Sequence, residues 1–567
     1  MPRSLLWFAL LCHVVFATGY AWCTPSFEGP DENSHYEYAW QMGNAGRQPL
    51  AGALVRARNL PQIEGAEIAI HPPLYYALLG RVLALTGTDD TVFGPMLNPD
   101  FGNPDKPSRN LKYLHGSGQG EGVLFGLRLL SVLFGAITVV LVHRLGRATC
   151  PAQPRVADLA ALLVATLPMF SFLHGLVHND TLAIPLATGT TLLLVRVLQH
   201  DAPTWRHGVG LGALIGVGLL TKLTALFLLP LVAAAFAAAW WRGSGERRRA
   251  IVRTTALTLL VAGGISAPMF LRNLELYGDV LAMAAHDATF PPIPPELRWD
   301  VFRDGFLPNV FRSVFGTFGW FALHPHPLLV ACGVGVATLA LFGLWRAGRD
   351  RRPEALPRPL WLLALAMGLV FAATAQFNWK APQPQARFLF PAIGPAAVVL
   401  ATGLLRLVAR LPQRRWLLVL PPLTAAVVFV AWFLPAFRPG LAPAPPWQRA
   451  LVGDIVRRPD APVITWQAPL PTHWRLPLTL RWSDPGAPAG ARYTLYVHDD
   501  AGRVLLATHE WTHGGMLLQN GEATLPDGLL PFLIGDELTF VLRRVPATPD
   551  EVPATLPTSP PLRLRRP

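Results

Sequence analysis

The sequence predicts a mainly α-helical, polytopic membrane protein of about 11 spans with a small C-terminal β-sandwich-like domain. Three observations support this fold class. Of the 567 residues, 51% are hydrophobic and only 15% are charged, and the mean hydropathy is +0.34. The hydrophobic residues form uninterrupted runs of about 20, the length of a helix that crosses a bilayer. Beyond residue 440 the chain instead alternates polar and apolar residues, as strands do.

The first hydrophobic run follows Arg3 and extends from Leu5 to Thr18. A cleaved signal peptide would begin in the same way, but no A-x-A cleavage site follows this run. We therefore favour an uncleaved first helix. Later spans are predicted from hydrophobic runs near residues 122–143, 157–174, 181–199, 208–221, 223–241, 251–271, 326–345, 359–376, 388–405 and 416–435.

The distribution of arginine predicts the orientation of these spans. The formal net charge is +13, and the arginines gather in alternate loops between the hydrophobic runs. Because basic residues accumulate in cytoplasmic loops, the charge indicates topology and not a nucleic-acid partner. A cytoplasmic N-terminus places every arginine-rich loop inside. Lys222 then lies at an outer turn within the run 208–241, where it avoids a mid-bilayer cost of about 3 kcal/mol.

These assignments divide the chain into two domains. Residues 1–439 form the predicted membrane domain, whose first outer loop, 23–121, contains one short apolar segment from Leu74 to Thr86. That segment is either an interfacial or a short helix. Residues 440–567 form the predicted β-rich domain outside the cytoplasm. Strand alternation at 476–482 and a hairpin of 493–497 with 504–507 indicate its strands.

Acidic residues at the outer membrane edge are candidates for chemistry. Asp31 and Glu32 directly follow the first helix, where poor solvation suits a carboxylate to base catalysis. Asp31 could instead cap the helix that follows. Asp180 is either the cap of its own helix or a second acidic group facing Asp31. His174 and His178 precede it and are a weaker candidate for a metal site. The four scattered cysteines have neither zinc-site nor disulfide spacing.

Three cations lie on the face that is otherwise poor in basic residues, namely Lys222, Arg272 and Arg387. Arginine and lysine clusters bind phosphate, and a polyprenyl phosphate would present its anion at this depth. Each cation alone could instead reach for lipid headgroups. Joint placement on one face favours a binding role.

Aromatic residues accompany these charges on the predicted outer face. They occur in His71-Pro72-Pro73-Leu74-Tyr75-Tyr76 and, within the loop 272–325, at Tyr277 and Trp320. Such rings stack on sugars, and they also anchor proteins at the membrane interface. The sequence leaves both interpretations open.

The order of these motifs resembles the multispanning GT-C type glycosyltransferases, above all the protein O-mannosyltransferase and aminoarabinose transferase group and its uncharacterised bacterial relatives. The resemblance covers about residues 20–435. It is carried by Pro30-Asp31-Glu32 with Tyr36, by His71 to Tyr76, by Gly218 to Lys222, by Arg272-Asn273 with Tyr277-Gly278-Asp279, and by Gln385-Ala386-Arg387-Phe388-Leu389-Phe390-Pro391. His35 stands where an arginine is common, and the insert at about 88–121 is long.

The resemblance implies inverting transfer of a sugar from a polyprenyl-phosphate donor to a glycan, lipid or protein acceptor outside the cytoplasm. It implies Asp31 as the catalytic base, with Glu32 or Asp180 assisting, and Lys222, Arg272 and Arg387 on the donor phosphate. Contacts to the substrate are expected from His35, His71, Tyr75, Tyr277, Trp320 and Gln385. No cofactor is firmly implied, and a metal requirement is left open. The expected location is a bacterial inner membrane.

Two other functions remain open at the level of sequence. A flippase or transporter of a lipid-linked saccharide would also bind phosphate within the membrane, but inverted repeats and mid-bilayer charges would be expected. A non-catalytic envelope assembly protein would function without Asp31 and Glu32.

Overall fold

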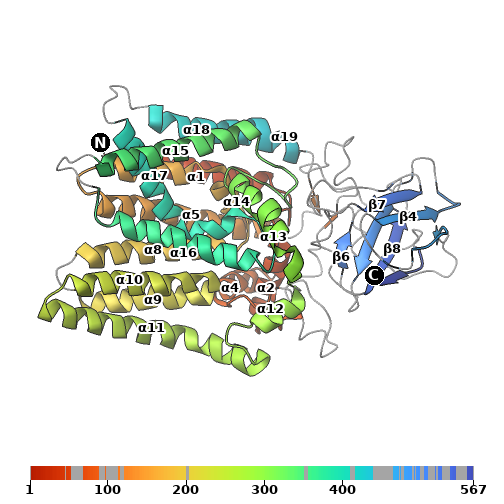
Figure 1. Ribbon diagram of the computed structural model, residues 1–567, viewed down its shortest axis with the longest axis horizontal. Coiled ribbons are helices and arrows are strands. Elements are labelled where there is room, and N and C mark those ends of the chain that lie inside the picture. Colours follow the sequence, from red (N-terminus) through yellow and green to blue (C-terminus); the bar gives the residue numbers. More distant parts are fainter. Residues whose placement is uncertain are drawn as a thin grey trace.

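The computed structural model is mainly helical, and a small β-rich unit follows the helices (Figure 1). It describes residues 2–44, 46–52, 68–87, 96–97, 111, 113–114, 121–199, 203–290, 292–349, 356–408, 416–438, 464–471, 473, 478–487, 491, 493–498, 504–507, 518, 521–525, 537–544 and 559–565.

Within these ranges, nine helical segments are long and apolar enough to cross a membrane. The fold class of a polytopic helical membrane protein is therefore confirmed. The helices behind these segments are α1 Pro2–Cys23, α5 Glu121–Thr149, α8 Asp180–Gln199, α10 Leu228–Trp241, α11 Gly245–Tyr277, α15 Pro327–Arg349, α16 Leu360–Asn378, α17 Ile393–Leu407 and α18 Trp416–Val427. Short helical turns extend three of them: η3 Leu223–Phe227 precedes α10, η6 Ala386–Ala392 precedes α17, and η7 Val428–Phe433 with α19 Leu434–Phe437 follows α18.

Two predicted spans differ in form from those nine. The span predicted at 157–174 consists of two helices, α6 Pro154–Ala165 and α7 Pro168–Leu173. Proline has no amide hydrogen to continue a helix and disfavours helical backbone in the residue before it, so the break precedes Pro168. The other is α9, Trp205–Thr221, whose 17 residues fall short of the roughly 20 of a full crossing.

A turn at Lys222 separates α9 from η3 and α10, as the sequence predicts. The backbone of Lys222 is extended, with φ −158° and ψ 134°, and so ends the helix. Helix α9 packs closely on α11, since a Cβ at Gly212 would lie 2.7 Å from the carbonyl oxygen of Thr258. The side chain of Lys222 is thereby presented at the end of the bundle.

The described residues between α1 and α5 form a helical layer at that end of the bundle. Helix α2, Glu32–Asn44, crosses α4, Leu74–Thr86, so the short apolar segment is a short helix. A Cβ at Gly43 would lie 2.0 Å from the carbonyl oxygen of Gly80, and only glycine permits this approach. Helix α12, Met283–Thr289, lies at the same end (Figure 1). Between α12 and α15 the chain forms η4 Pro295–Leu297, α13 Arg298–Asp300, η5 Val301–Phe306 and α14 Leu307–Ser313.

The strands of the C-terminal unit form two sheets that share one core. One sheet has the order β3-β4-β7 and the other β6-β5-β8-β9. Inward side chains of both sheets, such as Trp482 and Phe540, join one hydrophobic cluster, as in a sandwich. The predicted hairpin is confirmed, because β5 pairs antiparallel with β6. The strands are β3 Thr465–Trp466, β4 Leu478–Ser483, β5 Tyr493–His498, β6 Val504–Ala507, β7 Glu522–Leu525, β8 Glu537–Arg544 and β9 Leu562–Arg565, while β1 Met96–Leu97 pairs with β2 Tyr113–Leu114 in the first outer loop.

Candidate functional site

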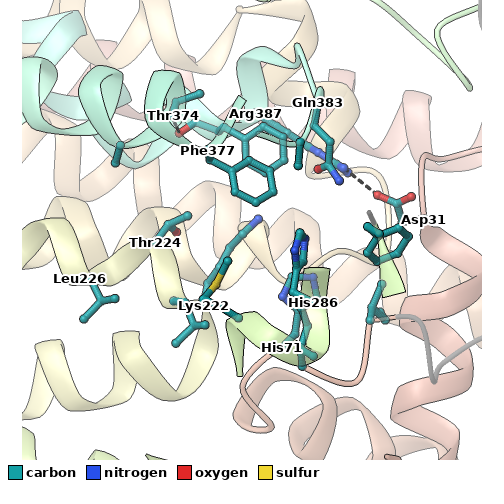
Figure 2. Close-up of a pocket in the computed structure, with 18 of the residues that line it drawn as sticks. Asp31, His71, Lys222, Thr224, Leu226, His286, Thr374, Phe377, Gln383 and Arg387 are labelled. Atoms are coloured by element: carbon teal, nitrogen blue, oxygen red, sulfur yellow. Dashed lines mark hydrogen bonds and ion pairs between the residues drawn. The ribbon is translucent and has the colours of Figure 1, made fainter. Parts of the chain in front are cut away.

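A cavity of about 630 Å³ opens where the α2–α4 layer meets the membrane helices. Its wall has a polar end and an apolar end (Figure 2). Charged and hydrogen-bonding side chains form the polar end, namely Asp31, Ser34, His35, His71, His178, Lys222, His286, Asp287, Lys380, Gln383 and Arg387. The amphipathic wall suits a ligand with a charged head and an apolar chain.

Asp31 meets Arg387 across the polar end. Arg387 Nη2 donates to Asp31 Oδ2 over 2.7 Å, and the Asp31 side chain is 39% exposed. Asp31 immediately precedes α2 and has φ 62°, a left-handed conformation that L residues other than Asp and Asn seldom adopt. Such strain is often retained where it aims a functional side chain. Here it places the carboxylate in the cavity.

Lys222 lines the cavity and bonds Asp180, which is buried behind the lining. The Lys222 Nζ and Asp180 Oδ1 atoms are 2.5 Å apart, and both side chains are almost fully buried. Asp180, the first residue of α8, is therefore the counter-ion of a pocket cation. The ring of Phe388 lies beside both cations, 5.1 Å from Lys222 Nζ and 5.3 Å from Arg387 Cζ. Its face favours cations at these distances.

His178 connects the two ion pairs. Its Nε2 lies 2.6 Å from Arg387 Nη1, and its Nδ1 lies 3.3 Å from Asp180 Oδ2. The residue belongs to the loop between α7 and α8. Lys222, Asp180, His178, Arg387 and Asp31 thus form one chain of contacts from the centre of the cavity to its exposed edge.

Three histidines at the polar end, His35, His71 and His178, are held in the uncharged form. Burial, together with the neighbouring cations, lowers the pKa of His35 and of His178 well below the ordinary value of 6.5. Burial also lowers the pKa of His71 to about 3. His35 Nδ1 pairs with the hydroxyl of Tyr76 over 2.8 Å. The rings therefore supply hydrogen bonds and shape without adding charge.

The apolar end of the cavity lies between the α10 side and α16. Leu223, Leu226 and Phe227 of η3 face Val370 and Phe377 of α16 across it. Figure 2 shows Leu226 and Thr224 well away from Asp31, with Lys222 between them. Helices α10 and α16 both belong to the segments long enough to cross a membrane. An alkyl or prenyl chain entering here would be solvated by side chains and by lipid.

Glu32 differs from the sequence expectation, because it is fully buried outside the cavity lining. Arg128 of α5 holds both carboxylate oxygens, at 2.9 Å and 2.6 Å. The remaining Arg128 donors reach the carbonyls of Ala21, Thr24 and Pro25. Glu32 Oε1 also accepts the amide of Val177 over 2.9 Å. We correct its assignment from assisting acid to structural residue, since its carboxylate is held in a buried ion pair and does not line the cavity.

Arg272 and Tyr277 also lie outside the cavity lining. Helix α11 continues past the predicted boundary at 271 and ends at Gly278, which has φ 67°. Both side chains hold the segment between α2 and α4: Arg272 Nη2 donates to the carbonyl of Pro49 over 3.3 Å, and the amide of Ala51 donates to the Tyr277 hydroxyl over 3.1 Å. The expected clamp of three cations is reduced to Lys222 and Arg387.

Three further residues expected at the substrate do not line the cavity. Tyr75 is fully buried in the cluster between α2, α4 and α5. Trp320 donates its indole N–H to the carbonyl of Phe27 over 3.2 Å. Gln385 lies at the start of η6, and the lining residue is Gln383, two positions earlier.

Several lining residues were not among the sequence candidates, namely Ser34, Thr224, His286, Asp287, Thr374, Lys380 and Gln383. His178 was considered only for a metal. The sequence did contain a signal for His178, because it lies only two residues before Asp180, the acidic first residue of α8. Among the described residues, no group of three or more histidine, cysteine, aspartate or glutamate side chains is placed to hold a metal ion.

Sequence comparison connects this chain with known proteins. Residues 120–266 match the family model described as dolichyl-phosphate-mannose-protein mannosyltransferase. A curated relative, undecaprenyl phosphate-alpha-4-amino-4-deoxy-L-arabinose arabinosyl transferase 2 of Pseudomonas fluorescens, is 28% identical over 287 residues, or 50% of this chain and 43% of that protein. Over these parts of its length the chain is similar to glycosyltransferases. It spans less than half of the length of that relative.

Solved structures also match at low identity. ArnT from Cupriavidus metallidurans, bound to undecaprenyl phosphate, has a TM-score of 0.45 and 16% identity over 76% of this chain and 63% of that one. The archaeal oligosaccharyltransferase AglB from Archaeoglobus fulgidus, in complex with an inhibitory peptide and a dolichol-phosphate, has a TM-score of 0.42 and 15% identity over 78% and 56%.

Proposed function

We propose that this protein is an enzyme that transfers a sugar from a polyprenyl-phosphate donor to an acceptor outside the cytoplasm. The observation that carries the proposal is the cavity itself, which has carboxylates and cations at one end, among them Asp31, Lys222 and Arg387, and an apolar lining at the other. The curated relative is named as a transferase for an undecaprenyl phosphate-linked sugar. Such a donor has a charged head and an apolar chain, which agrees with a cavity wall that has a charged end and an apolar end.

The donor phosphate would lie between Lys222 and Arg387. Both cations are buried, both line the cavity, and Phe388 holds them on one side. In the absence of donor they are neutralised by Asp180 and Asp31. The prenyl chain would leave between η3 and α16, where the lining is apolar. This placement puts the anomeric carbon of the sugar near Asp31.

Asp31 would act as the general base. The acceptor hydroxyl or amine gives its proton to the Asp31 carboxylate while its lone pair forms a bond to the anomeric carbon. The bond between that carbon and the phosphate oxygen breaks, and its electron pair stays on the phosphate. Lys222 and Arg387 stabilise the charge that develops there. Attack from the face opposite the leaving phosphate inverts the anomeric centre.

Asp31 fits this role better than the other acidic candidates. Its carboxylate is partly exposed and bonds Arg387, whereas the carboxylate of Asp287, also partly exposed in the lining, bonds His286. Asp180 and Glu32 are buried in ion pairs.

We keep the membrane and β-rich units, divided near residue 440, as proposed domains. Their boundary lies outside the described residues. The bacterial inner membrane, with the cavity and the β-rich unit on its outer side, is the proposed location.

The proposal is tested by transfer of a labelled sugar in membranes that contain the protein and a panel of polyprenyl-phosphate sugars. Wild type is expected to transfer from at least one donor, and Asp31→Asn is expected to lose at least 100-fold in rate, within the range of general-base catalysis. Asp300→Asn, at a surface carboxylate paired with Arg303, is the matched control and should retain full rate. Full activity of Asp31→Asn would refute the mechanism. Absence of transfer from every donor would favour a flippase or assembly role.

A further inference from the structure

His178 holds Arg387 through an uncharged acceptor. Because a guanidinium has no acceptor atom, Arg387 Nη1 is the donor in the 2.6 Å contact with His178 Nε2. The other ring nitrogen, His178 Nδ1, is held by the backbone amide of Asp180 over 3.1 Å. Asp180 Oδ2 lies 3.3 Å from the same nitrogen and is buried without a hydrogen bond among the described residues. The contact at Nδ1 fixes the imidazole with Nε2 directed at Arg387.

The contact becomes important when an anion enters the cavity. Arg387 is held at Nη2 by Asp31 and at Nη1 by His178, and its Nε atom is buried without a partner among the described residues. A phosphate that approaches Nη2 competes with the Asp31 carboxylate, because both are anions. His178 is then the contact that still directs the guanidinium. A carboxylate in its place would neutralise the cation, whereas an imidazole leaves the charge available to the phosphate.

We propose that His178 is a positioning residue that keeps Arg387 directed at the donor phosphate without neutralising it. The inference rests on the proposed function for its anionic ligand and adds a residue through which that site works. Asp180 then acts on both phosphate-binding cations: its carboxylate bonds Lys222, and its backbone amide holds the His178 ring that contacts Arg387.

The surroundings of His178 keep its ring neutral and fixed. It is buried, its ring lies 4.1 Å from that of His35, and His71, Lys222, Arg387 and Asp180 are the other titratable or charged groups that face it. Burial and the cationic neighbours hold its pKa well below 6.5. The loop is anchored one residue earlier, where the amide of Val177 donates to Glu32.

The test compares His178→Leu and His178→Gln in the purified full chain, with undecaprenyl phosphate alone as the probe. The Leu variant removes the acceptor and is expected to weaken binding by about tenfold or more, the effect of losing one hydrogen bond to a charged group. The amide oxygen of Gln can replace Nε2, so His178→Gln should restore binding to within about threefold. His174→Gln is the matched control, because His174 is a buried histidine of the same loop outside the cavity lining.

The outcomes separate this inference from the proposed function. Equal binding by His178→Leu and wild type, or equally weak binding by the Gln and Leu variants, overturns the role of His178. Weakened binding in His178→Leu with rescue in His178→Gln supports it even where no sugar is transferred, which would refute only the proposed function. Sugar transfer together with phosphate binding that does not depend on His178 would support the proposed function and refute the role of His178.

Discussion

Removal of Arg128 is expected to destabilise the protein strongly. The change Arg128→Met leaves the fully buried carboxylate of Glu32 with one remaining donor, the amide of Val177, and removes the donors to the carbonyls of Ala21, Thr24 and Pro25. Breaking a buried ion pair in this way costs about 3–5 kcal/mol. Glu32→Gln keeps one acceptor oxygen and should cost less, roughly 1–3 kcal/mol.

The assay is the free energy of unfolding in detergent micelles, measured for the two single variants and the double variant Glu32→Gln/Arg128→Met. The double variant is expected to lose less than the sum of the single losses, because it leaves no unpaired charge. Sugar transfer is measured on the same samples. A cost below about 1 kcal/mol for Arg128→Met would contradict a structural ion pair. Loss of transfer in Glu32→Gln at unchanged stability would instead return Glu32 to catalysis.

Three further predictions concern the cavity. Lys222→Met should raise the KM for donor at least tenfold, and it should destabilise the protein because Asp180 is left buried without its cation. In the double variant Lys222→Met/Asp180→Asn, the unfolding free energy should be restored but sugar transfer should not. Leu226 lines the apolar end of the cavity. Leu226→Asn should therefore weaken the binding of long polyprenyl phosphates by roughly tenfold and leave the binding of short, soluble analogues unchanged. Equal effects on the long and the short ligands would refute the proposed position of the prenyl chain. The unfolding free energy should fall as the pH drops below 6.5, by roughly 1.4 kcal/mol per pH unit for each of His35, His71 and His178. Burial holds the pKa of these histidines below 6.5, so the unfolded chain then binds more protons than the folded one. An unfolding free energy that does not change from pH 7.5 to 5 would contradict neutral buried rings.

Hydrophobic runs and the positions of charges were sufficient to predict the membrane fold. Each segment must satisfy its own backbone hydrogen bonds in lipid, so length and composition largely determine the spans. The break before Pro168 was missed although its cause, the effect of proline on the helix and on the residue before it, is local. The end of α9 at Thr221 was predicted, because Lys222 interrupts the apolar run there. The strand alternation at Leu478–Ser483 was visible because one face of that strand is buried.

The site was only partly visible in the sequence. Asp31, Lys222 and Arg387 line the same cavity, as the sequence predicts. Charged side chains beside membrane spans are costly in lipid and therefore gather in a shared polar cavity. Glu32 was misjudged because adjacent residues point in different directions, and its partner Arg128 lies 96 positions away within a span. The exchange of Gln383 for Gln385 is likewise a matter of local turn geometry. The position of His178 between the two ion pairs could not be inferred from the sequence, because it depends on the distances from its ring to Arg387 and Asp180.

The most direct test of the account is a structure of the protein with a polyprenyl phosphate bound. The account predicts the phosphate between Lys222 and Arg387, with the Asp31 carboxylate released from Arg387 Nη2 and the prenyl chain leaving between η3 and α16. A phosphate bound elsewhere, or a chain that leaves the apolar end empty, would contradict it.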